Sequence, residues 1–223
     1  MLISQLMISA SKFAGVFRDG EKIYTINSTP GKKVYGEKLV KETQEYREWV
    51  PNRSKLAAYL LKGGSFFPFQ KDSTVLYLGA ASGTTSSHIA DIVTSGTVAC
   101  VEFAPRSFRD LVTVCEERKN MIPILADATR PQEYSFAVSA PDIVYQDIAQ
   151  KGQAAIFLKN YQTFSAKCGL LVIKSRSEDV ARDPQKIYAE ACAELKAAGL
   201  KVVELVTLDP FEKDHAMIAV ESP

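Results

Sequence analysis

Short hydrophobic runs alternate with helical stretches along most of the chain, from residue 72 onward. Five runs read as strands: "VLYLG", "TVACVEF", "MIPILAD", "DIVYQD" and "GLLVIKS". The stretches between them, at about 84–94, 107–118, 152–166 and 183–198, read as helices. Continuous apolar runs of this length are typical of strands buried on both faces of a parallel sheet. The alternation predicts an α/β fold of βαβ units, with helices on both faces of a mostly parallel sheet.

The end of the chain departs from this alternation. Two further apolar runs, "LKVVELVTL" and "HAMIAVES", are joined by "DPFEKD" with no helical stretch between them. They predict a hairpin at one edge of the sheet, which raises the expected number of strands to seven. A terminal antiparallel hairpin on an otherwise parallel sheet is the arrangement of class I methyltransferases, which have a Rossmann-like fold.

The first part of the chain has a different pattern. Two short runs flank the turn signal Asp19-Gly20, and "STPGKKVYGEKLV" adds breakers and another short strand. We therefore expect residues 1–48 to form a small β-rich N-terminal domain and residues 49–223 to form the main domain. The stretch "VPNRSKLAAYLLKGG" predicts a helix at the start of the main domain, capped by Ser54 and ended by two glycines.

Composition narrows the class of protein only slightly. Among 223 residues, 46% are hydrophobic and 24% are charged, as in ordinary soluble globular proteins. No apolar run approaches the length of a membrane span, and no basic region precedes the first apolar residues, so we expect no membrane association and no signal peptide. The four cysteines are scattered without a C-x-x-C pair, which suggests a reducing compartment. Two histidines without a ligand cluster predict no metal site.

The charge is small but uneven along the chain. The net charge is +1, yet residues 1–62 carry 11 basic and 6 acidic side chains, a balance of +5, and the rest of the chain carries −4. A basic end can meet a polyanion. A charge this small does not predict tight RNA binding by the chain alone.

A glycine loop follows the first strand of the main domain, from Gly79 to Gly83. Glycine permits backbone angles and close approaches that a side chain would block. Thr84 and Thr85 can cap the helix that begins there, and its free N–H groups face the space beyond the strand end. The dinucleotide fingerprint has a glycine where this chain has Ala81, so the loop favours a cofactor without a pyrophosphate, such as S-adenosylmethionine. For the loop alone, an ordinary strand-to-helix turn remains the alternative.

Ionisable side chains end the other strands of the predicted sheet. The carboxylate of Glu102 can accept hydrogen bonds from both hydroxyls of a ribose, Phe103 can pack on an adenine, and Asp127 can accept from the adenine amino group. Asp147 and Lys174 end the fourth and fifth strands. Ligands of open α/β sheets bind at this edge, so charged groups that converge there predict a ligand site, although each alone can be a solvated surface charge.

Taken together, these stretches resemble the fibrillarin family in its archaeal fibrillarin-like form. The resemblance covers nearly the whole chain and rests on "VYGEKLV", "YREWVPNRSKLAAYLL", "VLYLGAASGTTSSHIADIV", "VEFAPRSFRDL", "DATRPQEY", "QDIAQ" and "DPFEKDHAMIAV". Eukaryotic members carry a Gly/Arg-rich extension that is missing here. The resemblance therefore implies an archaeal-type protein, located in the cytoplasm.

The resemblance also implies an activity and its partners. Members of the family transfer a methyl group from S-adenosylmethionine to ribose 2′-hydroxyls of RNA, as the catalytic subunit of box C/D ribonucleoproteins that modify rRNA and tRNA. The implied partners are a Nop-domain scaffold protein, a kink-turn-binding protein of the L7Ae type, the box C/D guide RNA and the target rRNA or tRNA. Carried over by position, the residues lining the cofactor pocket are Gly79, Ala81, Gly83, Thr84, Thr85, Glu102, Phe103, Asp127, Ala128, Asp147, Ile148, Ala149 and Gln150.

Related RNA ribose methyltransferases use a Lys-Asp-Lys-Glu tetrad. Lys55, Asp147 and Lys174 match its first three places, and His215 stands where those relatives have glutamate. A cation such as Lys174 favours negative charge developing on the ribose oxygen. Asp147 can orient that lysine and help to remove the proton, and Lys55 can reach the substrate from its helix. For His215, a locally hydrogen-bonded histidine and a chemical role are both open.

Three other functions fit parts of the sequence. A structural subunit of a ribonucleoprotein would bind cofactor weakly and bridge its partners without methylating. A small-molecule methyltransferase would need no RNA, but the basic first part and the paired lysines favour a substrate that bears phosphates. An NAD oxidoreductase is disfavoured by Ala81 in the glycine loop.

Overall fold

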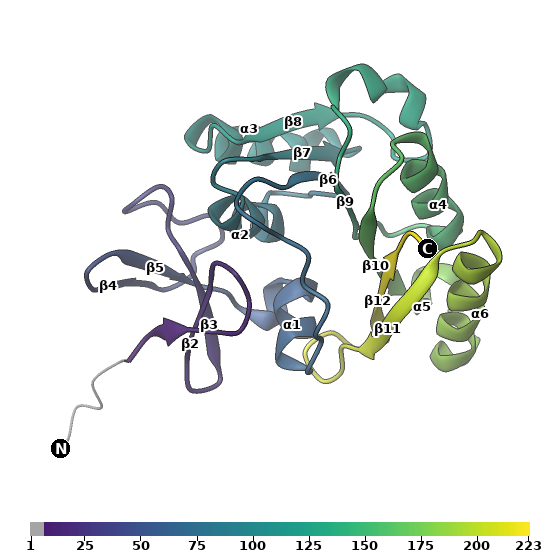
Figure 1. Ribbon diagram of the computed structural model, residues 1–223, viewed down its shortest axis with the longest axis horizontal. Helices are drawn as coiled ribbons and strands as arrows, with labels where there is room; N and C mark the ends of the chain where they lie inside the picture. Colours follow the sequence, from purple (N-terminus) through teal and green to yellow (C-terminus); the bar gives the residue numbers. More distant parts are fainter. Residues whose placement is uncertain (1–6) are drawn as a thin grey trace.

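The computed structural model describes residues 7–223, which contain two β-sheets (Figure 1). The smaller sheet is antiparallel, in the order β1-β2-β3-β5-β4. Its strands are Ser9–Ala10 (β1), Val16–Asp19 (β2), Lys22–Ile26 (β3), Leu39–Lys41 (β4) and Glu45–Glu48 (β5). All five precede the expected boundary at residue 48, and the strands of the larger sheet all follow it.

The larger sheet has seven strands in the order β11-β12-β10-β9-β6-β7-β8. They are Thr74–Leu78 (β6), Thr97–Glu102 (β7), Met121–Leu125 (β8), Ile143–Gln146 (β9), Cys168–Lys174 (β10), Lys201–Thr207 (β11) and His215–Glu221 (β12). Strands β10, β9, β6, β7 and β8 are parallel to one another, whereas β12 is antiparallel to both β10 and β11. The predicted mostly parallel sheet with a terminal hairpin is thus confirmed.

Helices cover both faces of the larger sheet, as the alternating pattern predicted (Figure 1). The α-helices are Lys55–Leu61 (α1), Thr84–Ile92 (α2), Pro105–Glu117 (α3), Gln153–Thr163 (α4), Ser175–Glu178 (α5) and Pro184–Ala197 (α6), and the 3-10 helices are Pro51–Arg53 (η1), Pro131–Glu133 (η2) and Ser135–Ala137 (η3). Val75 of β6 packs in one core with α1, α2 and α3. Its neighbour Leu76 packs on the opposite face with α4 and α6. Successive residues of a strand point to opposite faces, which explains why the run in β6 is apolar throughout.

Two helix starts and one strand test the local predictions. Ser54 caps α1 as expected, since its side chain accepts a hydrogen bond from Ala57 N. The predicted threonine cap on α2 is wrong: Gly83 is the N-cap, with a φ of 90°, and Thr84 and Thr85 are already helical. A left-handed backbone angle at the turn suits glycine, and the cap position falls on it. Strand β5 was not recognised because its letters, "EYRE", are mostly polar.

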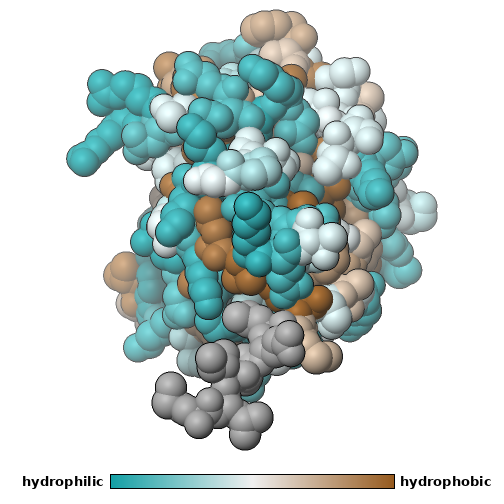
Figure 2. Space-filling model, turned by 90° about the vertical axis from the view of Figure 1, so that its left-hand side faces the viewer, coloured by the Kyte–Doolittle hydropathy of each residue, from teal (hydrophilic) through white to brown (hydrophobic). Residues whose placement is uncertain are grey.

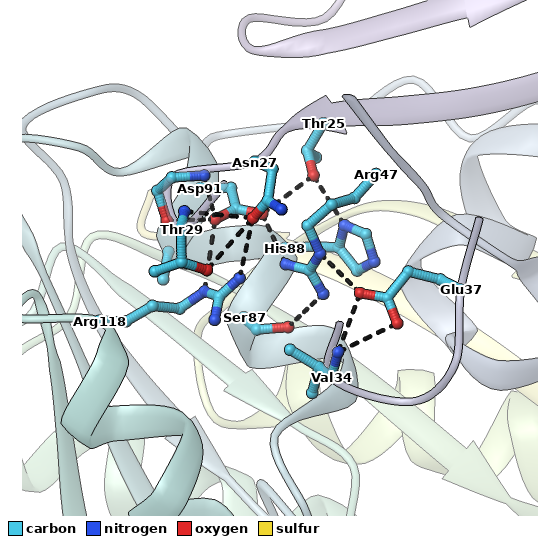
Figure 3. Close-up of polar contacts among 12 residues, drawn as sticks. Thr25, Asn27, Thr29, Val34, Glu37, Arg47, Ser87, His88, Asp91 and Arg118 are labelled. Carbon is cyan, nitrogen blue, oxygen red and sulfur yellow. Dashed lines mark hydrogen bonds and ion pairs between the residues drawn. The ribbon is translucent and has the colours of Figure 1, made fainter. Parts of the chain in front are cut away.

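Arg47, one of the polar residues of β5, is the centre of a buried ion network between the small sheet and α2 (Figure 3). The Arg47 guanidinium is fully buried and lies 2.7 Å from Glu37 Oε1 and 2.6 Å from Asp91 Oδ2. It also donates to Ser87 Oγ, and Arg118 lies 3.4 Å from the second oxygen of Asp91. Since Arg47 and Glu37 belong to the N-terminal part and Asp91 and Ser87 to α2, the network joins the small sheet to the main domain.

A neutral histidine completes this junction. Tyr35 Oη donates to the carbonyl oxygen of Glu48, so Nε2 of His88 carries the hydrogen that binds Tyr35, at 2.9 Å. Nδ1 lies 2.8 Å from the hydroxyl oxygen of Thr25, which also lies 3.2 Å from Asp91 Oδ2. Burial, assisted by the neighbouring arginines, holds the pKa of His88 well below its usual value, in agreement with this neutral tautomer. The ring also stacks on Trp49.

Figure 2 shows the side of the molecule that carries the N-terminal sheet. Hydrophilic residues cover most of this face, and a smaller group of hydrophobic residues lies near its centre. Such a mixture is ordinary, because apolar atoms contribute much of the surface of folded proteins. Within residues 7–223, no helix combines the length and the apolar character needed to cross a membrane.

Candidate active site

The loop after β6 approaches the loop after β9 very closely. Gly79 has a φ of 80°, and a Cβ placed on it would lie 2.6 Å from the carbonyl oxygen of Asp147. This position therefore requires glycine. Ala81 also has a positive φ, of 47°, which is costly for a residue with a side chain. Its N–H donates to Glu102 Oε2 at 2.8 Å, and this bond helps to hold the strained turn.

Glu102 is fixed at the end of β7 by two backbone donors. Oε2 accepts from Ala81 N and Oε1 from Ala104 N, both at 2.8 Å. The side chain is buried, so the alternative of a freely solvated strand-end carboxylate is excluded. Each carboxylate oxygen has more than one lone pair. The group can therefore keep both backbone bonds and still accept hydrogen bonds from a ligand.

A pocket of about 390 Å³ opens at the carboxyl ends of the parallel strands. Its lining residues are Gly79, Ala81, Val101, Glu102, Phe103, Ala104, Ala126, Asp127, Ala128, Asp147, Ile148, Ala149, Gln150 and Lys174. Of the predicted cofactor residues, the pocket brings together all except Gly83, Thr84 and Thr85. Thr85 is buried, and its hydroxyl donates instead to Ser54 Oγ at 2.9 Å.

Two further lining residues, Phe103 and Asp127, present groups that remain available to a ligand. Phe103 is 71% exposed, so one ring face is free to stack on a ligand. Asp127 Oδ1 accepts from Thr129 N at 2.8 Å, which fixes the carboxylate while its second oxygen remains an available acceptor. Both residues fit the roles that the strand-end pattern predicted for them.

A Lys–Asp–Lys cluster, formed by Lys55, Asp147 and Lys174, adjoins this pocket, which Asp147 and Lys174 line. Asp147 follows β9, Lys174 ends the adjacent strand β10, and Lys55 is the first residue of α1. Lys174 Nζ lies 2.7 Å from Asp147 Oδ1, and Lys55 Nζ lies 3.3 Å from Asp147 Oδ2. All three side chains are largely buried, at 12–17% exposure. The sequence placed these three residues together correctly.

The two lysines keep Asp147 ionised. Burial acts to raise the pKa of this carboxyl group, but the charges of Lys174 and Lys55 and their hydrogen bonds outweigh burial, so the pKa lies below its usual value. A carboxylate with a lowered pKa is a weak base. Asp147 is therefore better suited to orienting two ammonium groups than to removing a proton.

His215 begins β12, directly opposite Lys174 in the ladder between β10 and β12. Its Nδ1 lies 2.6 Å from the carbonyl oxygen of Lys213, and only a protonated nitrogen can bond a carbonyl. Burial is the main cause that lowers the pKa of His215 below its usual value, with Lys55 and Lys174 contributing. In this neutral tautomer, Nε2 carries a lone pair. The local hydrogen bond and a chemical role are thus compatible.

Sequence reasoning missed one charged neighbour of the cluster. Glu212, in the loop between β11 and β12, lies 4.0 Å from Lys55 Nζ. The sequence does show acidic residues in "DPFEKD", the loop before the strand that carries His215. The direction of a loop side chain does not follow from strand periodicity, so the pairing was not deducible.

The sheet order and the pocket at its carboxyl edge define the class I, S-adenosylmethionine-dependent methyltransferase fold. Within this class, the chain belongs to the fibrillarin family, whose family model matches residues 7–222.

The similarity to individual members extends over whole chains. The fibrillarin-like rRNA/tRNA 2′-O-methyltransferase of Methanothermobacter thermautotrophicus is 49% identical over 210 residues, covering 93% of this chain and 94% of that protein. Aeropyrum pernix fibrillarin, crystallised with natively bound S-adenosyl-L-methionine, has a TM-score of 0.88 and 42% identity, covering 98% of this chain and 100% of that one. A crystallised fibrillarin/Nop5p complex gives a TM-score of 0.88 and 38% identity, covering 96% and 100%.

Proposed function

We propose that this protein is an S-adenosylmethionine-dependent RNA ribose 2′-O-methyltransferase that modifies rRNA and tRNA as the catalytic subunit of a box C/D ribonucleoprotein. The name of its relative from Methanothermobacter thermautotrophicus supports the activity. The fibrillarin crystallised with Nop5p supports a Nop-domain scaffold partner. We extend the proposal, on the family resemblance, to a kink-turn-binding protein of the L7Ae type and to a guide RNA that selects the target.

The observation that carries the proposal is the Lys–Asp–Lys cluster beside the pocket. The pocket fits the cofactor chemically. Glu102 offers a fixed carboxylate for ribose hydroxyls, Phe103 an exposed ring for adenine, and Asp127 a free oxygen for its amino group. At position 79 the backbone lies so close to Asp147 that there is no space for a side chain. When bound, S-adenosylmethionine supplies an electrophilic methyl group.

The cluster activates a weak nucleophile. A ribose 2′-hydroxyl must be held in line with the methyl group and must lose its proton as it attacks. Two ammonium groups close to that oxygen favour the negative charge that develops on it. Asp147 holds both ammonium groups in place, at 2.7 Å and 3.3 Å. The cluster thus provides orientation and electrostatic stabilisation.

His215 is the residue of this site best suited to accept the proton. At neutral pH its Nε2 is unprotonated, because the pKa is lowered and Nδ1 holds the hydrogen. Protonated lysines cannot accept a proton, and Asp147 is the weaker base because its pKa is low. We assign to His215 the role that glutamate has in the related tetrads.

The direct test is methyl transfer from labelled cofactor to RNA paired with a guide. We expect transfer at one ribose when the guide RNA and the two partner proteins are present, and little transfer by the chain alone, since its net charge of +1 offers few phosphate contacts. A complete complex that assembles without methylating would identify a structural subunit. Turnover of a free metabolite without RNA would identify a small-molecule methyltransferase.

Glu102→Ala should weaken cofactor binding by the chain alone. The substitution removes a charged acceptor for two ribose hydroxyls, and hydrogen bonds to charged groups contribute about 1.5–3 kcal/mol, so we expect a loss of roughly 10- to 100-fold in affinity. Calorimetric titration with S-adenosylmethionine measures it, with Glu133→Ala as a control at an exposed glutamate. Equal affinities in the wild type and Glu102→Ala would contradict the assignment of the ribose site.

The pH dependence of methylation should reveal His215. The wild-type rate should fall as the pH decreases through the pKa of His215, which lies below 6.5, because protonation removes the acceptor nitrogen. His215→Ala should lower the rate and abolish this acid limb. The measurement is the single-turnover rate in the assembled complex from about pH 5 to pH 8, the range in which histidine titrates. An unchanged acid limb in the variant would assign the proton to another base.

A further inference from the structure

The main chain of Lys174 extends beyond the parallel strand next to it. Strand β9 pairs with β10 only as far as Gln146, which lies opposite Leu171. On the other side, β12 continues to His215, opposite Lys174. The edge of Lys174 that faces β9 therefore needs other partners for its N–H and C=O, because unpaired backbone groups are costly when buried.

The side chain of Gln153 supplies both partners. Its Oε1 accepts from Lys174 N at 2.8 Å, and its Nε2 donates to the carbonyl oxygen of Lys174 at 3.1 Å. A side-chain amide carries a donor and an acceptor side by side, as a peptide group does. Gln153 thus replaces the strand residue that β9 lacks at this level.

Gln153 is itself held without freedom to turn. It is fully buried, and its Nε2 also donates to Glu178 Oε1, at 2.9 Å. Glu178 further accepts from the backbone N–H groups of Gly152 and Gln153. The main-chain carbonyl oxygen of Gln153 accepts from Gln146 Nε2 at 2.7 Å. The bond to Glu178 fixes the orientation of the side-chain amide, because a carboxylate binds only its NH2 end.

We propose that Gln153 is a positioning residue for the methyl-transfer reaction, which fixes the backbone of Lys174 so that its ammonium group meets Asp147. This role rests on the proposed function of Lys174. Nζ of Lys174 contacts both Oδ1 and the carbonyl oxygen of Asp147. Both contacts require the main chain of Lys174 to place the start of the side chain correctly. The main-chain carbonyl of Gln153 also accepts from Gln146 Nε2, a contact that spans the segment 147–150 lining the pocket. One residue is thereby bonded both to the lysine and across that segment.

Gln153→Leu tests the inference, because leucine fills a similar volume without either hydrogen bond. In the assembled complex with saturating cofactor, we expect a single-turnover rate lower by about 10- to 100-fold, since small displacements of a reacting group have effects of this size. Cofactor affinity should change much less than the rate. The amide hydrogen of Lys174 should exchange faster with solvent, a local effect that general destabilisation would not confine to this strand end.

A second variant covers the case in which Gln153→Leu does not fold. Gln153→Glu combined with Glu178→Gln exchanges the two groups: the new carboxylate still accepts from Lys174 N and from the new amide. The variant loses the bond to the Lys174 carbonyl and the bond from the main-chain N–H of residue 153 to Oε1 of residue 178. We expect a rate between those of Gln153→Leu and the wild type. A wild-type rate in Gln153→Leu, or in the double variant where Gln153→Leu does not fold, would refute the positioning role.

Asn120→Asp is the matched control. Like Gln153, Asn120 has a side-chain amide bonded to the main chain: its Nδ2 donates to the carbonyls of Ala90 and Val93, at 2.8 and 2.7 Å. It precedes β8, at the opposite edge of the sheet. It should lose stability and keep its rate. An equal loss of rate in Asn120→Asp would mean that the Gln153 variants lose activity through general destabilisation, and would contradict the positioning role. Absence of methylation in the wild type would instead refute the proposed function, and this role with it.

Discussion

Lys174→Ala should reduce methylation in the assembled complex by about 10²–10³-fold, equivalent to roughly 2.7–4 kcal/mol of transition-state stabilisation. The substitution removes an ammonium group that lies 2.7 Å from Asp147 and lines the pocket. It leaves the Glu102 carboxylate, to which we assign the cofactor ribose, and its two backbone donors untouched. Cofactor affinity and assembly of the complex should therefore stay close to wild type. The measurement is the single-turnover rate with saturating cofactor.

Two further variants show whether the effect is specific to this position. Lys174→Arg should restore only part of the rate, because a planar guanidinium replaces a compact ammonium group. Lys167→Ala is the matched control: Lys167 directly precedes β10, at the end opposite Lys174, pairs with Asp142 at 2.6 Å and is 79% exposed. It should methylate at the wild-type rate. If Lys174→Ala did so too, catalysis would rest on Asp147, Lys55 and His215 without it.

The fold was predictable where hydrophobic spacing controls it. Strands β6, β7, β9, β10 and β12 are buried apolar runs, because both of their faces are covered. The edge strands β8 and β11 are rich in apolar residues but partly exposed. Prediction failed where polar residues are buried. Strand β5 reads as polar because Arg47 is enclosed by Glu37 and Asp91, which are distant in sequence. Spacing within a segment carries no information about such partners.

The site was predictable for a related reason. Parallel strands end at one edge, so Glu102, Asp127, Asp147 and Lys174 had to converge there. Side-chain direction beyond the strand ends was not predictable. Thr85 turns into the protein to bind Ser54, and Gln153 turns back to the main chain of Lys174. Both orientations depend on contacts between segments that only the folded chain brings together.

The same limit applies to the junction between the two sheets, whose strongest test is Arg47→Met. This variant should lose about 3–5 kcal/mol in the free energy of unfolding, because removal of one member of a buried ion pair leaves an uncompensated buried charge. Much of this loss would come from Glu37, whose buried carboxylate would be left without its ion-pair partner. Burial acts to raise its pKa, and Arg47, followed by backbone hydrogen bonds, reverses that shift and holds the pKa below its usual value. Urea unfolding of the chain alone measures the loss.

Two comparisons separate the buried charge from the loss of a large side chain. Arg47→Met combined with Glu37→Gln should recover part of the stability, since a neutral amide is less costly to bury than an unpaired carboxylate. Arg130→Met makes the same change at an arginine that is 66% exposed and lies 3.2 Å from Glu133, and exposed pairs contribute at most about 1 kcal/mol. Equal losses in Arg47→Met and Arg130→Met would mean that the network does not stabilise the junction. A large loss confined to Arg47→Met would show that this buried guanidinium contributes strongly to the junction between the small sheet and α2, the helix that begins beside the glycine loop.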